Sequence, residues 1–228
     1  MKSLKNWFLV LSVLSCFGCS SPVHEDGRGC AFVSDSIQYR VEFMSEGCVR
    51  ILSFPEGDTL VTKRLVVDSE KPAFKDYKWE DTGQKLLFRT RELSVVFDKA
   101  DAAFIFQETS TGKLLLKEKG DRKARNFKRS VAGGEQCLEV TQRFVPTEDE
   151  AIYGLGQYQN GIMNYRGKSV LLLQANMDIV NPFLISTNGY GVLWDNYSST
   201  KFEDTKEGYS FTSEVGDASD YYFVYGKN

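Results

Sequence analysis

Acidic and amide side chains are the main candidates for chemistry, because this chain of 228 residues contains one histidine, His24. That count argues against histidine-based catalysis and histidine-rich metal sites. The densest acidic group is Glu148, Asp149 and Glu150. Consecutive side chains on a strand point to opposite faces, and carboxylates are mostly exposed. We therefore expect this group to hydrate a turn rather than to form a general acid–base pair.

Cysteine chemistry is also restricted. After the N-terminal apolar segment, the chain contains Cys30, Cys48 and Cys137, and none of them has CxxC spacing. A metal site is therefore not expected. Three cysteines in an exported protein cannot all pair, although a Cys30–Cys48 bridge stays open. We expect all three to be small, partly buried apolar residues.

Three further patterns could be functional or structural. Residues 153–156 (YGLG) would need a following helix to bind phosphate, and none is visible, so the glycines are expected to allow a bend or close backbone packing. The basic run 122–129 could contact anionic lipid, but we expect 118–135 to be an exposed connection or hairpin end. Tyr190 and Trp194 could stack on sugars, but strand aromatics more often fill a core. The net charge of −3 argues against nucleic-acid binding.

The first 18 residues have the anatomy of a secretion signal, which is too short to span a membrane. Lys2 and Lys5 precede an apolar run, and Gly18 precedes Cys19. This arrangement resembles a bacterial lipoprotein signal, in which the cysteine is lipidated. We favour Cys19; Cys16 and an ordinary signal peptide are the alternatives. The predicted organisation is a signal over 1–18, a lipid-anchored flexible tether over 19–30 and a folded body over 31–228. The protein is then exported and held at a bacterial membrane, in the periplasm or at the cell surface.

The folded body, residues 31–228, is predicted to consist of strands, so strands and the turns between them must position any functional site. Apolar and polar residues alternate through it, turn residues separate the runs, and no dozen residues carry a helical stripe. This pattern predicts an all-β, antiparallel sandwich of two sheets. The expected strands are 37–43, 49–54, 60–67, 85–90, 93–97, 103–107, 113–117, 137–144, 170–174, 183–186, 191–194, 209–212 and 221–225.

A series of motifs in fixed order carries a family resemblance. They are IYGLGQ (152–157), LQAN (173–176), NPFLIS (181–186), GYGVLWDN (189–196) and DYYFVYG (220–226). Together they resemble the N-terminal domain of glycoside hydrolase family 31, and more closely its α-xylosidase branch. The resemblance implies a galactose-mutarotase-like β-sandwich, which in the family precedes a (β/α)₈ barrel that carries both catalytic aspartates.

No segment of this chain matches the family's W-x-D-x-x-E strand end. A retaining glycosidase needs two carboxylates across the scissile bond. We therefore expect no catalytic residue here, no activity from the chain alone, and a truncated enzyme or fragment whose barrel is missing. An epimerase, which would use histidine, is not expected because the only histidine lies in the predicted tether.

One loop has a stronger functional case. In the family, this loop reaches over the barrel mouth, and the matching positions here are Gln174 and Asn176, with Asp178 two residues further on. Amide and carboxylate groups hydrogen-bond sugar hydroxyls, although all three could equally be turn residues. The expected partners are an oligosaccharide (a xyloside or glucoside), the catalytic barrel and a membrane through the anchor, with no cofactor, metal or nucleic acid.

The resulting prediction is a non-catalytic, carbohydrate-binding and supporting N-terminal domain of an α-xylosidase- or α-glucosidase-like enzyme of carbohydrate metabolism. The alternative is a free-standing carbohydrate-binding surface lipoprotein. The two differ in their surfaces, because a supporting domain should expose an apolar face where the barrel docks.

Overall fold

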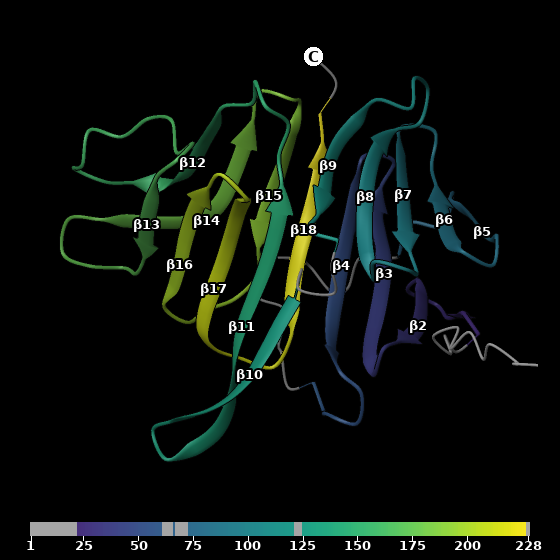
Figure 1. Cartoon of the computed structure of the whole chain (residues 1–228), viewed down its shortest axis with the longest axis horizontal. Helices are drawn as coiled ribbons and strands as arrows, with labels where there is room; N and C mark the ends of the chain where they lie inside the picture. The colour runs from purple at the N-terminus through teal and green to yellow at the C-terminus, as the bar shows by residue number, and fades with distance from the viewer. Residues whose placement is uncertain (1–21, 61–65, 67–72, 121–124, 227–228) are drawn as a thin grey trace, which may run out of the picture.

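The computed structural model describes residues 22–60, 66, 73–120 and 125–226, and in these residues it contains strands and no helix. None of them forms a helix that could span a membrane. Two antiparallel sheets pack face to face, which confirms the predicted sandwich (Figure 1). The predicted strand 60–67 lies almost entirely outside the described residues.

The first sheet has eight strands, and every neighbouring pair is antiparallel. Its order is β1 (His24–Glu25), β2 (Cys30–Ser34), β3 (Ile37–Ser45), β4 (Cys48–Pro55), β18 (Ser219–Tyr225), β15 (Tyr190–Trp194), β14 (Ile179–Ser186) and β12 (Ile152–Gln157). The C-terminal strand β18 lies at the centre, between β4 and β15. This sheet is therefore completed only when the last described residues are in place.

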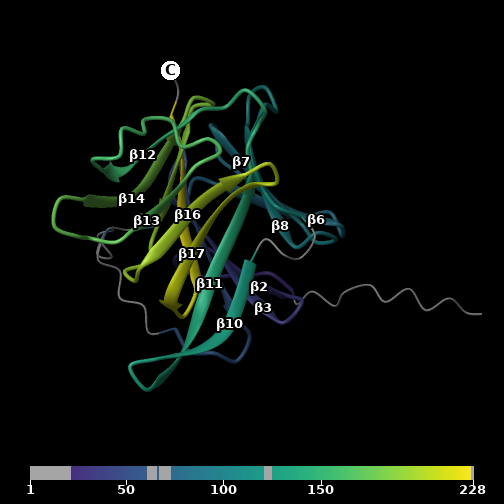
Figure 2. The same cartoon turned by 60° about the vertical axis from the view of Figure 1, so that its left-hand side comes forward.

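The second sheet has ten strands. Its order is β13 (Ser169–Leu172), β16 (Thr200–Thr205), β17 (Gly208–Gly216), β11 (Glu135–Val145), β9 (Leu114–Glu118), β8 (Ala103–Glu108), β7 (Leu93–Asp98), β6 (Lys85–Arg89) and β5 (Lys78–Asp81), with β10 (Arg125–Ala132) paired to β11. The strands β13 and β12 are edge strands of the two sheets, and they lie at the same end of the molecule (Figures 1 and 2).

Aromatic rings fill the space between the sheets. Phe106 of the second sheet stacks on Phe223 of the first, with ring centroids 4.2 Å apart. Trp194 stacks on Phe211 at 5.6 Å and donates its indole N–H to the Ser213 hydroxyl at 2.8 Å. Burial of this apolar area is the main force that holds the sheets together. Tyr190 and Trp194 are buried here, as predicted, and neither is free to stack on a sugar.

The segment 118–135, predicted to be an exposed connection or hairpin end, does contain the exposed end of the β10–β11 hairpin at residues 133 and 134, but not all of it is exposed. Residues 125–132 form β10, which pairs with β11 over its whole length. The Arg125 guanidinium turns inward, lies over the ring of Tyr39 at 4.9 Å and forms an ion pair with the buried Glu118 carboxylate. Lys128 and Arg129 have exposed side chains, as expected, whereas positions 122 and 123 lie outside the described residues.

The predicted flexible tether is also corrected in part. His24 and Glu25 pair with the start of β2, and the Asp26 carboxylate accepts hydrogen bonds from the backbone N–H groups of Arg28 and Gly29. Burial raises the pKa of Asp26, but these hydrogen bonds and the Arg40 charge outweigh it, so the pKa lies below the usual 3.8. Residues 24–29 are thus fixed to the sandwich by a turn and an ion pair. Cys19 lies outside the described residues, and the boundaries of the signal and tether stay a prediction.

Candidate functional site

The candidate site lies at the end of the sandwich formed by β12, β13 and β14. The connection from β13 to β14, residues 173–178, joins an edge strand of the second sheet to the first sheet, and we call it the arm. Its tip is closed by a bridge between Ala175 and Asp178, with the Asp178 N–H donating to the Ala175 carbonyl at 3.1 Å. All three predicted sugar-contacting residues therefore belong to one compact turn.

Within the arm, Gln174 differs from the other two predicted residues. Its side-chain N–H donates to the Asp178 carbonyl at 2.7 Å, and its side-chain carbonyl accepts the Val180 N–H at 3.1 Å. Gln174 thus closes the base of the arm, as a turn residue does. Asn176 is exposed and Asp178 is half-buried. Contact of these side chains with a sugar stays a prediction.

A bulge in β12 shapes the strand that pairs with β14. Gly154, Leu155 and Gly156 all have positive φ values, of 98°, 66° and 118°, and the β12–β14 register shifts between the two glycines. A Cβ on Gly156 would lie 2.0 Å from the Ile179 carbonyl oxygen. The glycines therefore allow both a bend and a close backbone approach, which confirms their predicted role. Leu155 adopts a conformation that is costly for a non-glycine residue, and it is fully buried.

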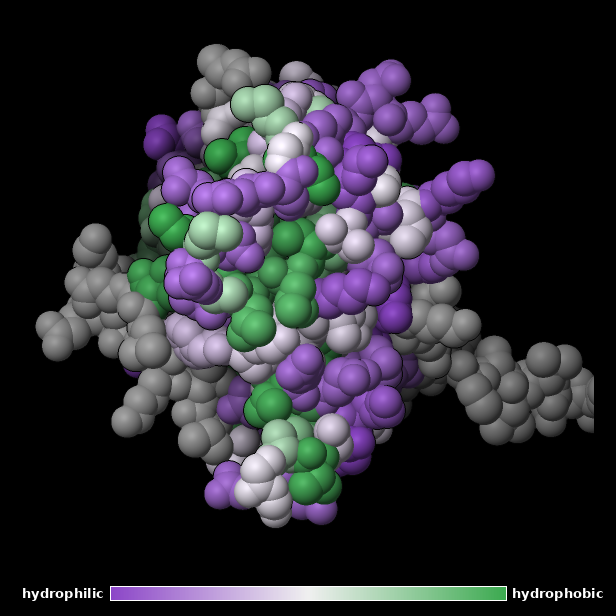
Figure 3. Space-filling model, turned by 90° about the vertical axis from the view of Figure 1, so that its left-hand side faces the viewer, coloured by the Kyte–Doolittle hydropathy of each residue, from purple (hydrophilic) through white to green (hydrophobic). Residues whose placement is uncertain are grey.

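An apolar surface surrounds the base of the arm. The exposed fractions are 50% for Ile185, 51% for Leu171 and 55% for Ile179. The members of this surface, which we call the docking face, are Tyr153, Leu171, Leu173, Met177, Ile179 and Ile185. Figure 3 shows apolar side chains gathered at this end of the molecule, with hydrophilic ones around them. An exposed apolar face was expected from the sequence, but its residues were not identified. The run 179–186 could have revealed part of it, because apolar residues fall on both faces of this one strand.

A hollow of about 460 Å³ lies beside the arm. Leu172, Val180 and Pro182 give it apolar walls, and Asn181 and Asp195 give it polar groups. Asp195 is 4% exposed, and its two carboxylate oxygens are buried without a hydrogen-bond partner. Sequence reasoning placed Asp195 only in a strand motif. Its position directly after a tryptophan of a predicted core strand could have indicated that this acidic residue is buried.

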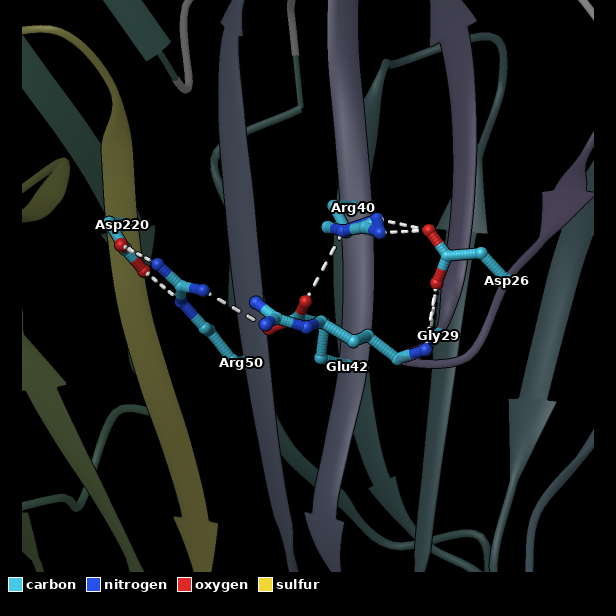
Figure 4. Close-up of polar contacts among 7 residues, drawn as sticks. Asp26, Gly29, Arg40, Glu42, Arg50 and Asp220 are labelled. Carbon is cyan, nitrogen blue, oxygen red and sulfur yellow. Dashed lines mark hydrogen bonds and ion pairs between the residues drawn. The ribbon is translucent and has the colours of Figure 1, made fainter. Parts of the chain in front are cut away.

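A charged cluster on the first sheet is structural. The Arg50 guanidinium donates to Asp220 through Nε at 2.7 Å and to Glu42 through Nη1 at 3.1 Å, and Glu42 also accepts from Arg40 (Figure 4). This ladder crosses β3, β4 and β18 and continues to Asp26 before β2. Each carboxylate in it is hydrogen-bonded to a guanidinium. It therefore lacks an acid–base pair suited to glycoside hydrolysis.

The acidic group at 148–150 does not simply hydrate a turn. Glu150 is 5% exposed, and its carboxylate accepts hydrogen bonds from the hydroxyls of Tyr190 and Thr147 and from the Thr147 N–H. The expectation of exposed carboxylates is therefore wrong for Glu150, because the turn folds it against the core. Burial, together with the neighbouring Tyr209 and Glu150, raises the pKa of Tyr190 above its ordinary value.

The three cysteines of the body are free thiols, and none is fully exposed. Burial raises the pKa of Cys30 and of Cys48 to about 11. Neither thiol is therefore a ready nucleophile at neutral pH. In the described part of the chain, no three His, Cys, Asp or Glu side chains are grouped to hold a metal ion.

Comparison with known proteins agrees with this architecture. The family described as glycosyl hydrolase 31 N-terminal galactose mutarotase-like domain matches residues 38–203. An α-xylosidase of Saccharolobus solfataricus is 32% identical over 206 residues, which are 84% of this chain and 26% of the relative.

Two solved structures have the same fold. The α-xylosidase of Xanthomonas citri is 29% identical with a TM-score of 0.68, over 81% of this chain and 20% of that one. An α-xylosidase from a soil metagenome, solved with xylose, is 24% identical with a TM-score of 0.73, over 91% of this chain and 33% of that one. The chain thus spans a third or less of the length of these relatives.

Proposed function

The chain belongs to glycoside hydrolase family 31 through its N-terminal galactose mutarotase-like domain, and we propose that it is the non-catalytic supporting domain of an α-xylosidase-like enzyme. The observation that carries the proposal is the docking face. Its six exposed apolar side chains lie at one end of the sandwich. Exposed apolar patches mark interaction surfaces. The occupant we propose is the catalytic portion that the much longer relatives possess.

The arm extends this role to the substrate. Asn176 is exposed at the tip of the arm, and Met177 of the docking face lies next to it. A catalytic domain seated on the docking face would therefore approach the arm. We propose that Asn176 and Asp178 then contact the hydroxyls of a xyloside or glucoside, since amide and carboxylate groups suit that contact.

A chimera tests the docking proposal. The full chain replaces the corresponding N-terminal region of the Saccharolobus α-xylosidase, and hydrolysis of an α-xyloside is measured. Ile185→Asp on the docking face is expected to reduce activity and stability strongly, because it places a charge in an apolar interface. Val131→Asp is the matched control, since Val131 is 61% exposed but lies on β10. Equal activity of the two variants would refute docking through this face.

The second part of the proposal is that this chain has no hydrolytic activity of its own. The purified full chain, incubated with an α-xyloside, should release no sugar above the buffer control. Clear turnover that persists after removal of contaminating enzymes would overturn the non-catalytic assignment.

A free-standing carbohydrate-binding lipoprotein is the second candidate, and the hollow of about 460 Å³ beside the arm is the observation that favours it. The two candidates differ in the need for the docking face. A free-standing module should bind sugar equally well with Ile185→Asp and should give no active chimera.

Export and lipid attachment are a further part of the proposal, resting on the signal anatomy of residues 1–18 and on Cys19. Metabolic labelling with a radioactive fatty acid in a bacterial host tests it. Cys19→Ala should abolish labelling, whereas Cys16→Ala should leave it intact. The opposite pattern would move the lipidation site to Cys16, and no labelling of the wild-type chain would refute the anchor.

A further inference from the structure

The strand β13 forms one edge of the second sheet, and half of its residues turn their backbone groups away from that sheet. Among the described strands, β16 is the one that pairs with β13. One position before β13, the Asp204 N–H donates to the Lys168 carbonyl at 2.8 Å, so this is a hydrogen-bonded pair. Hydrogen-bonded and non-hydrogen-bonded pairs alternate along an antiparallel ladder. The N–H and C=O groups of Ser169 and Leu171 therefore point out of the edge.

The other side of β16 leads to the same assignment. The Glu214 N–H donates to the Ser199 carbonyl at 3.0 Å, one position before the β16–β17 ladder. The odd-numbered residues of β16 therefore bond to β17, and the even-numbered ones bond to β13. The odd-numbered residues are those that lie opposite Ser169 and Leu171. Because β17 already uses their backbone groups, Ser169 and Leu171 receive no hydrogen bond from β16.

This edge carries apolar side chains and lacks the usual protection. Leu171 is 51% exposed, whereas the neighbouring Leu172 is 3% exposed and belongs to the core. Residues 169–172 (SVLL) include no charged residue and no proline, and their ladder with β16 has no register shift. Charged side chains, proline and bulges are devices by which proteins prevent an edge strand from pairing with another chain. The free edge of β13 is therefore open to a further strand.

The edge of the first sheet at the same end of the molecule is closed. The Ile152 N–H of β12 donates to the Asn164 side-chain carbonyl at 3.1 Å, and the Ile152 carbonyl accepts from the Tyr165 N–H at 2.8 Å. The Leu155 carbonyl accepts from the Tyr158 hydroxyl at 3.0 Å. The connection that follows β12 thus caps the backbone groups that β14 does not use.

The edges far from β13 are protected in other ways. In β5, three of the four residues are charged, namely Lys78, Glu80 and Asp81. The strand β1 has two residues, and its Glu25 carboxylate accepts a hydrogen bond from the Tyr77 hydroxyl at 3.0 Å. The strand β10 contains three basic residues. Within the described sheets, the apolar edge that lacks such protection is β13.

We propose that an extended segment of the catalytic portion adds to the free edge of β13 as a further strand of the second sheet. Ser169 and Leu171 supply the main-chain hydrogen bonds, and an apolar side chain of the segment packs beside Leu171. Main-chain bonds give affinity in this mode of recognition, and alternate side chains give specificity. The inference rests on the proposed function, because Leu171 belongs to the docking face and the relatives contain the additional length of chain.

The first experiment tests the assignment of the backbone groups in the full chain alone. Leu171→Pro removes an N–H that points outward, and proline is tolerated at such an edge position. The melting temperature should therefore change little. Val170→Pro removes an N–H that donates to β16, and it should lower the melting temperature by roughly 5–10 °C. Equal falls in the two variants would show that the chain itself uses the Leu171 N–H, and would overturn the proposal.

The second experiment compares hydrogen exchange in the full chain and in the chimera with the Saccharolobus α-xylosidase, measured by mass spectrometry with residue-level fragmentation. The amides of Ser169 and Leu171 should exchange freely in the chain alone and at least about tenfold more slowly in the chimera. The amides of Val170 and Leu172 should be protected in both. Free exchange of the Leu171 amide in an active chimera would refute strand addition.

Hydrolysis of an α-xyloside by the chimera separates main-chain pairing from apolar contact. Leu171→Ala keeps the N–H and removes most of the side chain, whereas Leu171→Pro removes the N–H. Leu171→Pro should reduce activity about tenfold more than Leu171→Ala does, because it leaves a buried carbonyl of the partner without a donor. Equal reductions would assign Leu171 an apolar contact alone, and would overturn strand addition while the supporting role stands.

Two further outcomes concern the occupant. An inactive chimera would refute the supporting role, and with it the inference that rests on that role. Concentration-dependent dimerisation of the isolated chain, measured by analytical ultracentrifugation and abolished by Leu171→Pro, would assign the edge to a second copy of this chain and overturn the proposed partner.

Discussion

The ion pair between Arg125 and Glu118 gives the sharpest test of how this sandwich is held together. The Glu118 side chain is fully buried and the Arg125 side chain is 5% exposed. Glu118 also accepts the Phe104 N–H at 2.8 Å and the Tyr221 hydroxyl at 2.7 Å, so it connects β8, β9, β10 and β18. The perturbation is Arg125→Met, which keeps the length of the side chain but removes the charge.

The expected cost follows from burial. Removing one partner of a buried ion pair leaves an uncompensated charge and typically costs about 3–5 kcal/mol. This is a large fraction of the roughly 5–15 kcal/mol by which a domain is stable. The neighbouring Arg129 pairs with Asp58 at 2.9 Å, but its side chain is 66% exposed. Arg129→Met on the same strand should therefore cost less than about 1 kcal/mol.

The assay is equilibrium urea unfolding of the full chain, followed by tryptophan fluorescence. Arg125→Met should lower the midpoint by roughly 1–3 M, given ordinary urea slopes, whereas Arg129→Met should change it little. The double variant Glu118→Gln with Arg125→Met should be more stable than Arg125→Met alone, because it removes the unpaired buried charge of Glu118. Equal midpoints for the two arginine variants, or additive losses in the double variant, would refute this reasoning.

Three further predictions concern the bulge, the N-terminal turn and the thiols. Gly156→Ala should destabilise the chain by more than about 1 kcal/mol in thermal unfolding, because the added Cβ would collide with a backbone oxygen. Gly161 also has a positive φ but has open space around it, so Gly161→Ala should lower the stability less. Equal losses of stability in the two variants would contradict the steric argument. The pKa of Asp26 is lowered in the folded chain, so the ionised carboxylate stabilises the fold fully above about pH 4, and this stabilisation is lost as the pH falls through the lowered pKa. Asp26→Asn should therefore abolish this part of the acid dependence of stability, measured by NMR of β1. An acid profile unchanged by Asp26→Asn would contradict the role of Asp26. The three cysteines of the body are free, so a reducing agent should leave the melting temperature unchanged, and a marked fall would reveal a disulfide.

Much of the architecture could be read from local patterns. Alternation over 37–43 and 103–107 fixed which residues face the core, since a strand has a side-chain period of two. The order of the YGLG, NPFLIS and GYGVLWDN motifs indicated the family, which the match over residues 38–203 confirms. The glycines of β12 were correctly interpreted because a strand tolerates such residues mainly at bends and close approaches.

The errors arose where a residue's environment comes from distant parts of the chain. Arg125 was assigned to an exposed basic run, yet Glu118 and the rings of Tyr39 and Phe104 enclose it. Glu150 was assigned to the solvent, yet Tyr190, which lies 40 residues further along the chain, bonds it in the core. Charged residues look alike in a sequence, and burial with a partner is a property of the assembled sheets.

The sequence by itself therefore determined many of the strands, the two-sheet class and the family, because periodicity and motif order are local properties of a chain. It did not predict β2, β5, β10 or β16. Only the tertiary structure decided the placement of the chemistry. It brought β12, β13 and the arm to one end, gathered apolar side chains there, and buried Asp195 without a partner beside them. The physical reason is that exposure and hydrogen-bond satisfaction depend on which strands become neighbours, and strands far apart in the sequence, such as β4 and β18, are neighbours here.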